Sequence, residues 1–373
     1  MDRAIPAAMV VISALSAGCG EAPVAPSGSP ADVQLSKGPA VPPGPQCPPH
    51  SNFRVDTESR LRSALARAKP GNVIAIKGMI QITRDLQIST PGIVLTCDKA
   101  GSGLQAAGTN PGDFVQTLLL VTASGVQVNH LVVDSRAAHA ALVALGSDGL
   151  PAVQDVVFED NSIQCATDEL CVEFLGNVEG GRISRNEITG EGTNVAIRLF
   201  ARITFEGTSL VRGTRVEDNV LTAPTNVASA LWGLEMAFAD RIVVTGNTIH
   251  GPWRIGMHAV NLSNSTIRNN VIDGPRQFGI LVPRSFTPDE GLNGSSVALN
   301  RIRGTGEAAI SLNVGCGNDW YLNDISGNGS GMFLLAPTGN NRVTTTEPNL
   351  INDAGAYDCD GDGVNDPNTI IVP

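Results

Sequence analysis

The fold is decided by the stretch Asn247-Thr-Ile-His-Gly-Pro-Trp-Arg-Ile-Gly256, which returns 23 residues later as Asn270-Val-Ile-Asp-Gly-Pro-Arg-Gln-Phe-Gly279. Each copy opens with asparagine, one variable residue and an aliphatic residue. Eight copies of this triplet form a series at intervals of 23 to 33 residues, starting at Asn129, Asn161, Asn186, Asn219, Asn247, Asn270, Asn300 and Asn323. A repeat of this length is a supersecondary unit that buries its apolar side only by stacking on its neighbours.

Short β-prone runs precede the triplets, as at Val156-Val-Phe158 and Ile242-Val-Val244. They lack the periodicity of helical repeats, so the sequence predicts a solenoid wound from parallel β-sheets. Asparagine tolerates the left-handed backbone of a tight corner and both donates and accepts hydrogen bonds. We therefore expect each asparagine to bond its equivalent one coil away, forming a ladder. The alternative is that asparagine is simply common in turns.

This pattern resembles the right-handed parallel β-helix family, the pectin-lyase-like fold, over roughly residues 53 to 345. The resemblance implies an all-β fold, a right-handed parallel β-helix solenoid of about ten coils spaced about 4.8 Å apart. Lyases, hydrolases, epimerases, adhesins and phage spikes share this fold, so it says little about activity. The sequence lacks the catalytic motifs of polygalacturonases, pectate lyases and alginate epimerases, and no catalytic residue is assigned by motif.

One amphipathic segment, residues 57–69, is expected to form a capping α-helix over the unpaired strand edges at the N-terminal end. Thr57 is the expected N-cap, Pro70-Gly71 ends the helix, and the apolar face consists of Leu61, Ala64, Leu65 and Ala68. The first strands are predicted at residues 73–76, 79–82 and 92–96. We place the β-helix at residues 47–345 and a C-terminal cap at residues 346–373.

The N-terminus has the features of a targeting segment. A short apolar stretch ends in Leu15-Ser-Ala-Gly-Cys19, which resembles a bacterial lipoprotein cleavage box. We expect residues 1–19 to be a lipoprotein signal peptide, with Cys19 lipidated, and residues 20–46 to be a disordered tether rich in Pro, Ala, Ser and Gly. The protein would then be exported and lipid-anchored at the bacterial cell envelope. An ordinary secretory signal is the alternative, whereas the apolar stretch is too short for a membrane-spanning helix.

Six further cysteines suggest disulfides, because an even number is typical of exported chains. We expect Cys165–Cys171 to close a loop between two strands, Cys47–Cys97 to hold the entrance of the domain, and Cys316–Cys359 to hold its tail. Six cysteines nevertheless allow 15 pairings. A zinc site is the weaker alternative, since no C-x2-C pair is present and the five histidines are scattered.

Charge and composition restrict the partners. Lys+Arg 25 against Asp+Glu 36 gives a net charge of -11, which argues against a nucleic-acid partner. An anionic polysaccharide remains compatible, because arginines can cluster locally. We expect a monomer that contacts the membrane only through its lipid anchor.

A second strand follows each asparagine triplet by about a dozen residues. Aligning these strands on their alternation places one polar residue in each of several coils at one outward position: Glu173, Arg198, Glu235, His258 and Ser311. Leu281 and Phe333 interrupt the column. Two places earlier every residue is small: Cys171, Ala196, Gly233, Gly256, Gly279, Ala309 and Gly331. Because residues two apart share a strand face, we expect a flat lane for an extended polysaccharide. The alternative is an ion-pair ladder on a solvated sheet, with glycines that shape corners.

The corners that enter this lane carry Trp253, Arg254 and Arg276, together with His250, and Arg284 lies just past the next strand. Tryptophan beside arginines suits stacking on a sugar and pairing with a uronate carboxylate. In a β-elimination, a cation neutralises that carboxylate and a base removes the adjacent proton. We assign His258 as the candidate base, with Glu235 beside it. The alternative function is a non-catalytic adhesin or surface scaffold.

The tail Asp358-Cys-Asp-Gly-Asp-Gly-Val-Asn-Asp366 resembles a calcium loop of the EF-hand or thrombospondin type 3 kind. Carboxylates at alternate positions suit a hard cation. A structural Ca2+ held by Asp358, Asp360, Asp362 and Asp366 is therefore expected. The alternative is a plain acidic turn, since Thr369 stands where an EF-hand has its bidentate glutamate.

Overall fold

The computed structural model describes residues 47–107, 115–147, 150–165, 170–190, 194–201, 203–204, 207–208, 210–223, 230–283, 291–335, 337–360 and 362–373. The chain divides into two units, residues 1–42 and 43–373, and only the second contains described residues. The predicted signal peptide with Cys19, the predicted tether and Arg284 lie outside the described residues.

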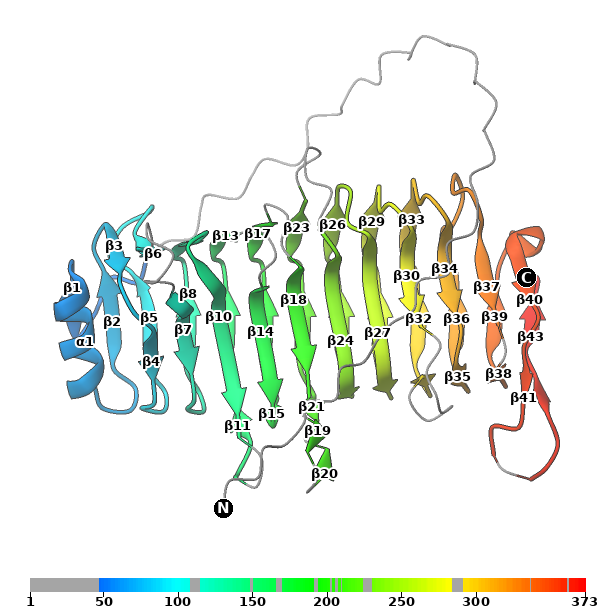
Figure 1. Cartoon of the computed structure of the whole chain (residues 1–373), viewed down its shortest axis with the longest axis horizontal. Helices are drawn as coiled ribbons and strands as arrows, with labels where there is room; N and C mark the ends of the chain where they lie inside the picture. Colours follow the sequence, from blue (N-terminus) through cyan, green and yellow to red (C-terminus); the bar gives the residue numbers. More distant parts are fainter. Residues whose placement is uncertain are drawn as a thin grey trace, which may run out of the picture. The chain divides into compact units, whose positions relative to one another are not determined.

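Three parallel sheets, here called A, B and C, form the walls of the second unit, and the chain visits them in that order in each coil that has a strand in all three (Figure 1). Sheet A has 13 strands, from β1 (Phe53–Val55) to β43 (Thr369–Ile371). Sheet B has nine strands, from β3 (Met79–Ile82) to β33 (Arg301–Arg303). Sheet C runs from β4 (Leu86–Ile88) to β40 (Ile351–Asp353). Each strand pairs with the equivalent strand one coil away.

Sheet C contains the longest strands of the coils and the predicted lane. Its central strands, in chain order, are β10 (Ala138–Gly146), β14 (Leu170–Gly176), β18 (Val195–Phe200), β24 (Trp232–Asp240), β27 (Ile255–Ser263), β30 (Phe278–Val282), β34 (Ala308–Leu312) and β37 (Met332–Leu334).

The predicted fold is confirmed as a right-handed parallel β-helix. Nine coils contribute a strand to all three sheets, in agreement with the expected number of about ten coils. Beyond residue 345, β40 and β43 add further strands to sheets C and A. The stack of strands therefore continues past the boundary drawn from the sequence.

The core consists of files of identical or similar side chains stacked coil on coil. In sheet B such a file contains Ile188, Leu221, Ile249, Ile272 and Ile302, all at most 1% exposed. Burying each such side chain contributes about 1.5–3 kcal/mol. Every residue of a file contacts its equivalents in the coils above and below. One repeat of the sequence therefore adds one layer to the core.

The corner between sheets A and B contains the predicted asparagine ladder. Side-chain amides donate to the next side-chain oxygen at 2.9–3.0 Å along the series Asn161, Asn186, Asn219, Asn247, Asn270, Asn300 and Asn323. From β8 (Gln127–Asn129) to β33, two residues separate the sheet A strand from the sheet B strand in every coil. The first of the two has positive φ, for example Asp160 at 55° and Arg185 at 53°.

The expectation that Asn129 joins this ladder is wrong. Asn129 ends a sheet A strand opposite Glu159, and Leu131 occupies the ladder position, its backbone N–H donating to Asn161 Oδ1 at 3.1 Å. His130, with φ of 59°, takes the left-handed place. In this coil the asparagine therefore lies two residues before the ladder position, and Leu131, the aliphatic residue of the triplet, occupies that position.

A second polar ladder follows the corner that leads into sheet A. Side-chain oxygens accept the backbone N–H of the preceding coil along the series Ser265, Ser295, Asn318, Asn341 and Asn368. Each member is followed by one variable residue and then an apolar residue: Ile267, Val297, Trp320, Val343 and Ile370. Because the first two members are serines and Trp320 is aromatic, the asparagine–aliphatic triplet alone does not trace this series.

The N-terminal cap is confirmed as helix α1 (Glu58–Arg67). The Thr57 side chain accepts the Arg60 N–H, and Leu61 and Ala64 are buried against the first strands. The strands that follow are β2 (Val73–Ile76), β3 and β5 (Val94–Cys97). The helices that the structure describes are too short or too polar to serve as membrane spans.

All three expected disulfides are present: Cys47–Cys97, Cys165–Cys171 and Cys316–Cys359. The first links the chain before β1 to β5, the second bridges sheets B and C, and the third links a corner of the last coils to the tail. Closing the chain in this way stabilises a fold by about 2–4 kcal/mol per bridge, chiefly by restricting the unfolded state.

Candidate functional site

The register of sheet C places the predicted polar residues in one column, as the alignment of the sequence indicated. Glu173 pairs with Arg198, Arg198 with Glu235, and Glu235 with His258. We call these four residues the polar column. The same position continues through Leu281, Ser311 and Phe333. These side chains point away from the core, on the outward face of the sheet.

Glu173 and Arg198 form a closed ion pair. The Arg198 Nε and Nη2 atoms lie 2.6 Å and 2.5 Å from Glu173 Oε1. The Glu173 side chain is only 5% exposed, and the Arg198 guanidinium also lies over the Phe200 ring, 5.0 Å from its centroid. Separating these two side chains would leave a buried charge without its partner, which costs free energy. These two residues therefore behave as the ion-pair alternative predicted.

Glu235 and His258 form the second half of the column. His258 Nδ1 lies 3.5 Å from Glu235 Oε1, and the two side chains are 12% and 8% exposed. Nδ1 is buried and has no hydrogen-bond partner among the residues that the structure describes. With Nδ1 facing the carboxylate, Nε2 is the ring nitrogen left for a ligand. An imidazole held beside a carboxylate can accept or donate a proton.

Trp232 lies outside the polar column but adds an aromatic ring to this pair, and the alternation of the strand does not predict its position there. Its ring stacks on the His258 ring with centroids 4.8 Å apart and planes 6° apart. Trp232 is half-buried at the first position of β24, three residues before Glu235. Strand alternation alone does not bring positions three apart together; the long indole reaches along its strand and across to the next coil.

Trp253 does not have the predicted role. It is completely buried, with its indole N–H unpaired among the described residues. The corner between sheets B and C directs this side chain into the core, so it cannot stack on a sugar. The physical reason is that a corner side chain can point either way, and a large apolar ring gains most by burial.

The two described arginines of the corners differ. Arg276 donates from Nε to Pro252 O and from Nη2 to Ala230 O, both at 2.9 Å, and so ties together the corners of the preceding coils. Arg254 is exposed and donates from Nε to the neutral Gln277 side chain at 2.6 Å. Among the described residues Arg254 has no acidic partner, so nothing described there compensates its positive charge beside sheet C. His250, by contrast, lies in β26 (Thr248–His250) of sheet B, 3.3 Å from Asp273.

The expected lane of small residues is also wrong. The seven small residues are buried rather than exposed. A Cβ atom at Gly256 would lie 2.5 Å from Ile272 Cγ2 and 2.7 Å from Gly279 O. Ala196 and Ile197 are both fully buried, so inward-outward alternation fails where these strands begin. The small column lets sheet C approach the isoleucine file of sheet B, which is the corner-shaping alternative.

Sheet A carries a separate cluster of ion pairs. Glu159 accepts from Arg182 and Arg185 at 2.8 Å each, and Arg185 also reaches Asp160 at 2.7 Å. Hydrogen bonding to Asp160 raises the pKa of Arg185 above its ordinary value. Since every charge in this cluster has an opposite partner, we assign it to holding neighbouring coils together.

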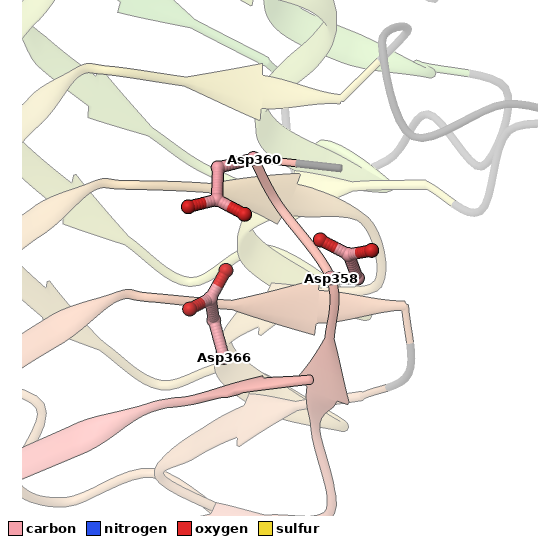
Figure 2. A group of neighbouring side chains, drawn as sticks. All are labelled: Asp358, Asp360 and Asp366. Atoms are coloured by element: carbon pink, nitrogen blue, oxygen red, sulfur yellow. The ribbon is translucent and has the colours of Figure 1, made fainter. Parts of the chain in front are cut away.

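The tail brings three of the four predicted calcium ligands together. Figure 2 shows the carboxylates of Asp358, Asp360 and Asp366 facing a common space, with ligand atoms within 4.8 Å of one another. Asp358 accepts the Gly363 N–H and Asp366 the Cys359 N–H, at 2.8 Å and 2.9 Å. The Asp362 side chain instead accepts the Val364 N–H. The oxygen-only donor set suits a hard cation such as calcium.

Comparison with known proteins supports the fold. Residues 171–347 match the family described as "Right handed beta helix region", so the resemblance inferred from the asparagine triplets is confirmed. No curated protein sequence matches the chain.

Solved structures with the same fold include two alginate lyases. The enzyme from Paenibacillus sp. str. FPU-7 aligns with a TM-score of 0.58 and 13% identity, over 77% of this chain and 98% of its own. The PL6 family alginate lyase AlyGC aligns with a TM-score of 0.54 and 14% identity, over 83% of this chain and 50% of its own. The Dettilon tailspike protein aligns over 85% of this chain and 65% of its own, at 14% identity and a TM-score of 0.47. The likeness to the two alginate lyases, at 13% and 14% identity, shows the fold alone.

Proposed function

We propose that the outward face of sheet C binds an extended polysaccharide, centred on Trp232, Glu235 and His258. The observation that carries the proposal is the arrangement of these three residues: an indole stacked on an imidazole that faces a carboxylate. Indole faces bind the apolar faces of sugar rings, and the polar pair supplies hydrogen bonds to hydroxyl groups. Both alginate lyases with this fold act on a polysaccharide by name, which is consistent with the proposal.

The finer proposal is that a uronate chain binds here and is cleaved by β-elimination. Arg254 would pair with the uronate carboxylate, since its side-chain partner among the described residues, Gln277, is neutral. His258 Nε2 would take the proton from C5, a double bond would form between C4 and C5, and the C4–oxygen bond would break. The proton on His258 would then be available to the departing oxygen, so that the base is restored.

Replacing Trp232 by alanine is expected to weaken polysaccharide binding at least about tenfold, because a central aromatic anchor carries much of the affinity of a site. Calorimetric titration of the domain with a panel of uronate and neutral polysaccharides measures this effect. Tyr321→Ala removes an exposed aromatic ring from β36 (Asp319–Tyr321) of sheet A and is the matched control.

Replacing His258 by glutamine separates the two proposals. If cleavage occurs, the variant should lose ultraviolet absorbance of the unsaturated product by about a hundredfold or more while binding stays within a few-fold. Binding without product in the unaltered protein would overturn the lyase proposal and leave a binding module. Absence of both would favour the adhesin or scaffold.

We further propose that Cys19 carries a lipid that anchors the protein to the bacterial cell envelope. The support is the sequence Leu15-Ser-Ala-Gly-Cys19 after a short apolar stretch. Cys19→Ser should move the protein from the membrane fraction to the soluble exported fraction, because one serine cannot take the thioether-linked lipid. Unchanged partitioning on fractionation would refute lipidation.

We also propose that Asp358, Asp360 and Asp366 hold a structural calcium ion in the tail. Calcium at about a hundred times its Kd should stabilise the folded protein by about 2.7 kcal/mol, seen as a rise in the melting temperature. Asp360→Asn should abolish the rise, whereas the control Asp319→Asn, on sheet A, should preserve it. An equal melting temperature with calcium and with a chelator would show that the tail is a plain acidic turn.

A further inference from the structure

Sheet C has a hollow on its outward face, next to the proposed site. Its volume is about 540 Å³, within the range of roughly 300–1,000 Å³ typical of ligand pockets. Phe278, Ser311 and Phe333 are among the residues that line it. Ser311 lies two coils from His258 in the same column, a distance of about 10 Å.

The hollow exists because β34 carries small side chains between two strands that carry phenylalanine. Ala308 stands in register with Phe278, and Ser311 stands in register with Phe333. Both β34 residues are buried, whereas Phe278 and Phe333 are half-buried. The two rings therefore rise above the floor made by β34, and each leaves apolar surface accessible to a ligand.

The polar groups around the hollow are neutral or acidic. Ser311 donates to the Asn313 side chain at 2.8 Å, and the exposed Glu307 lies at the rim. No arginine, lysine or histidine is among the described residues that line it. The nearby Arg276 guanidinium is bound to carbonyl groups of earlier coils, on the side away from the hollow. An anionic sugar bound here would lose water from its carboxylate and find no cationic side chain among the described lining residues.

We propose that this hollow is a second sugar subsite and that it accepts an uncharged ring. The inference rests on the proposed function and makes it more specific. Aromatic faces with a few hydroxyl and amide groups suit a neutral sugar, while Arg254 beside the first subsite suits a uronate. The polysaccharide would then run along the stack of coils and contain uncharged sugars beside its acidic ones, rather than uronate alone.

The test compares two probes: hexasaccharides of polygalacturonate, in which every ring is charged, and hexasaccharides of hyaluronan, in which every second ring is uncharged. We expect the unaltered protein to bind the hyaluronan fragment at least about tenfold more tightly. Phe278→Ala and Phe333→Ala should each reduce that affinity about tenfold, with little effect on the polygalacturonate fragment. Glu307→Gln should reduce the preference for the hyaluronan fragment over the polygalacturonate fragment, because it removes a negative charge from the rim of the hollow. Tyr321→Ala should change neither affinity, and unchanged melting temperatures would show that the variants fold.

Two outcomes distinguish this inference from the function on which it rests. If Trp232→Ala weakens binding but neither phenylalanine variant does, or if the two probes bind equally, the second subsite is refuted and the polysaccharide-binding function stands. If the unaltered protein binds no polysaccharide of the panel, the proposed function is refuted and the subsite with it.

Discussion

Asn219→Ala is expected to lower the free energy of unfolding by about 2–4 kcal/mol, because a buried hydrogen-bond network loses an interior member. Asn219 Oδ1 accepts from both the side-chain amide and the backbone N–H of Asn186, at 3.0 Å each. Its own amide donates to Asn247 Oδ1 and to Ile183 O at 2.9 Å. Alanine would leave the Asn186 N–H without this partner in the interior of a corner.

Chemical denaturation monitored by circular dichroism measures the loss. Asn349→Ala is the matched control, since Asn349 is exposed in the short 3-10 helix Pro348–Leu350 and should change stability by less than about 0.5 kcal/mol. If both variants unfold at the same denaturant concentration, the ladder does not stabilise the coil.

Gly256→Ala is expected to destabilise the protein by about 3 kcal/mol, because the added methyl group overpacks the corner between sheets B and C. The new Cβ atom would lie 2.5 Å from Ile272 Cγ2 and 2.7 Å from Gly279 O. The isoleucine could turn aside, but the carbonyl oxygen belongs to the neighbouring strand and cannot move without breaking the sheet. Differential scanning calorimetry of the purified domain measures the change.

The control for this variant is Gly329→Ala. A Cβ atom at Gly329 would meet no atom closer than 3.7 Å, so its melting temperature should stay within a few degrees of that of the unaltered protein. If the two variants were equally stable, close packing against sheet B would not be the reason for small residues at these positions.

Most of the fold is predictable from the sequence because every coil must satisfy the same packing and hydrogen-bonding requirements, so the same residue pattern recurs. Seven of the eight triplets mark corners in which an amide must bond to its neighbour, and one such corner fixes the register of the strands beside it. The column from Glu173 to His258 followed from that register. The disulfides were predictable for a similar reason, since each joins cysteines that the coil geometry brings together.

The candidate site was less predictable, because side-chain direction at corners depends on packing that the triplets do not encode. Trp253 and Trp232 are both near the lane in sequence, yet one is buried and the other lies on His258. Strand alternation, continued to the start of each strand, predicts an exposed small column, whereas these residues border the corner and are buried. A polar column can equally be a ligand surface or an ion-pair ladder, and the structure shows one example of paired charges at Glu173 and Arg198.

The two-residue corner between sheets A and B is the invariant vertex of every coil from β8 to β33. Differences in repeat length, from 23 to 33 residues, must therefore be absorbed in the rest of the coil, within sheet C and at the two vertices that border it. Natural or engineered insertions can enlarge the walls around the proposed ligand surface. The hydrogen-bonded asparagines of the corner between sheets A and B keep the strands in register. Specificity could thus diversify on one side of the prism without disturbing the architecture of the other.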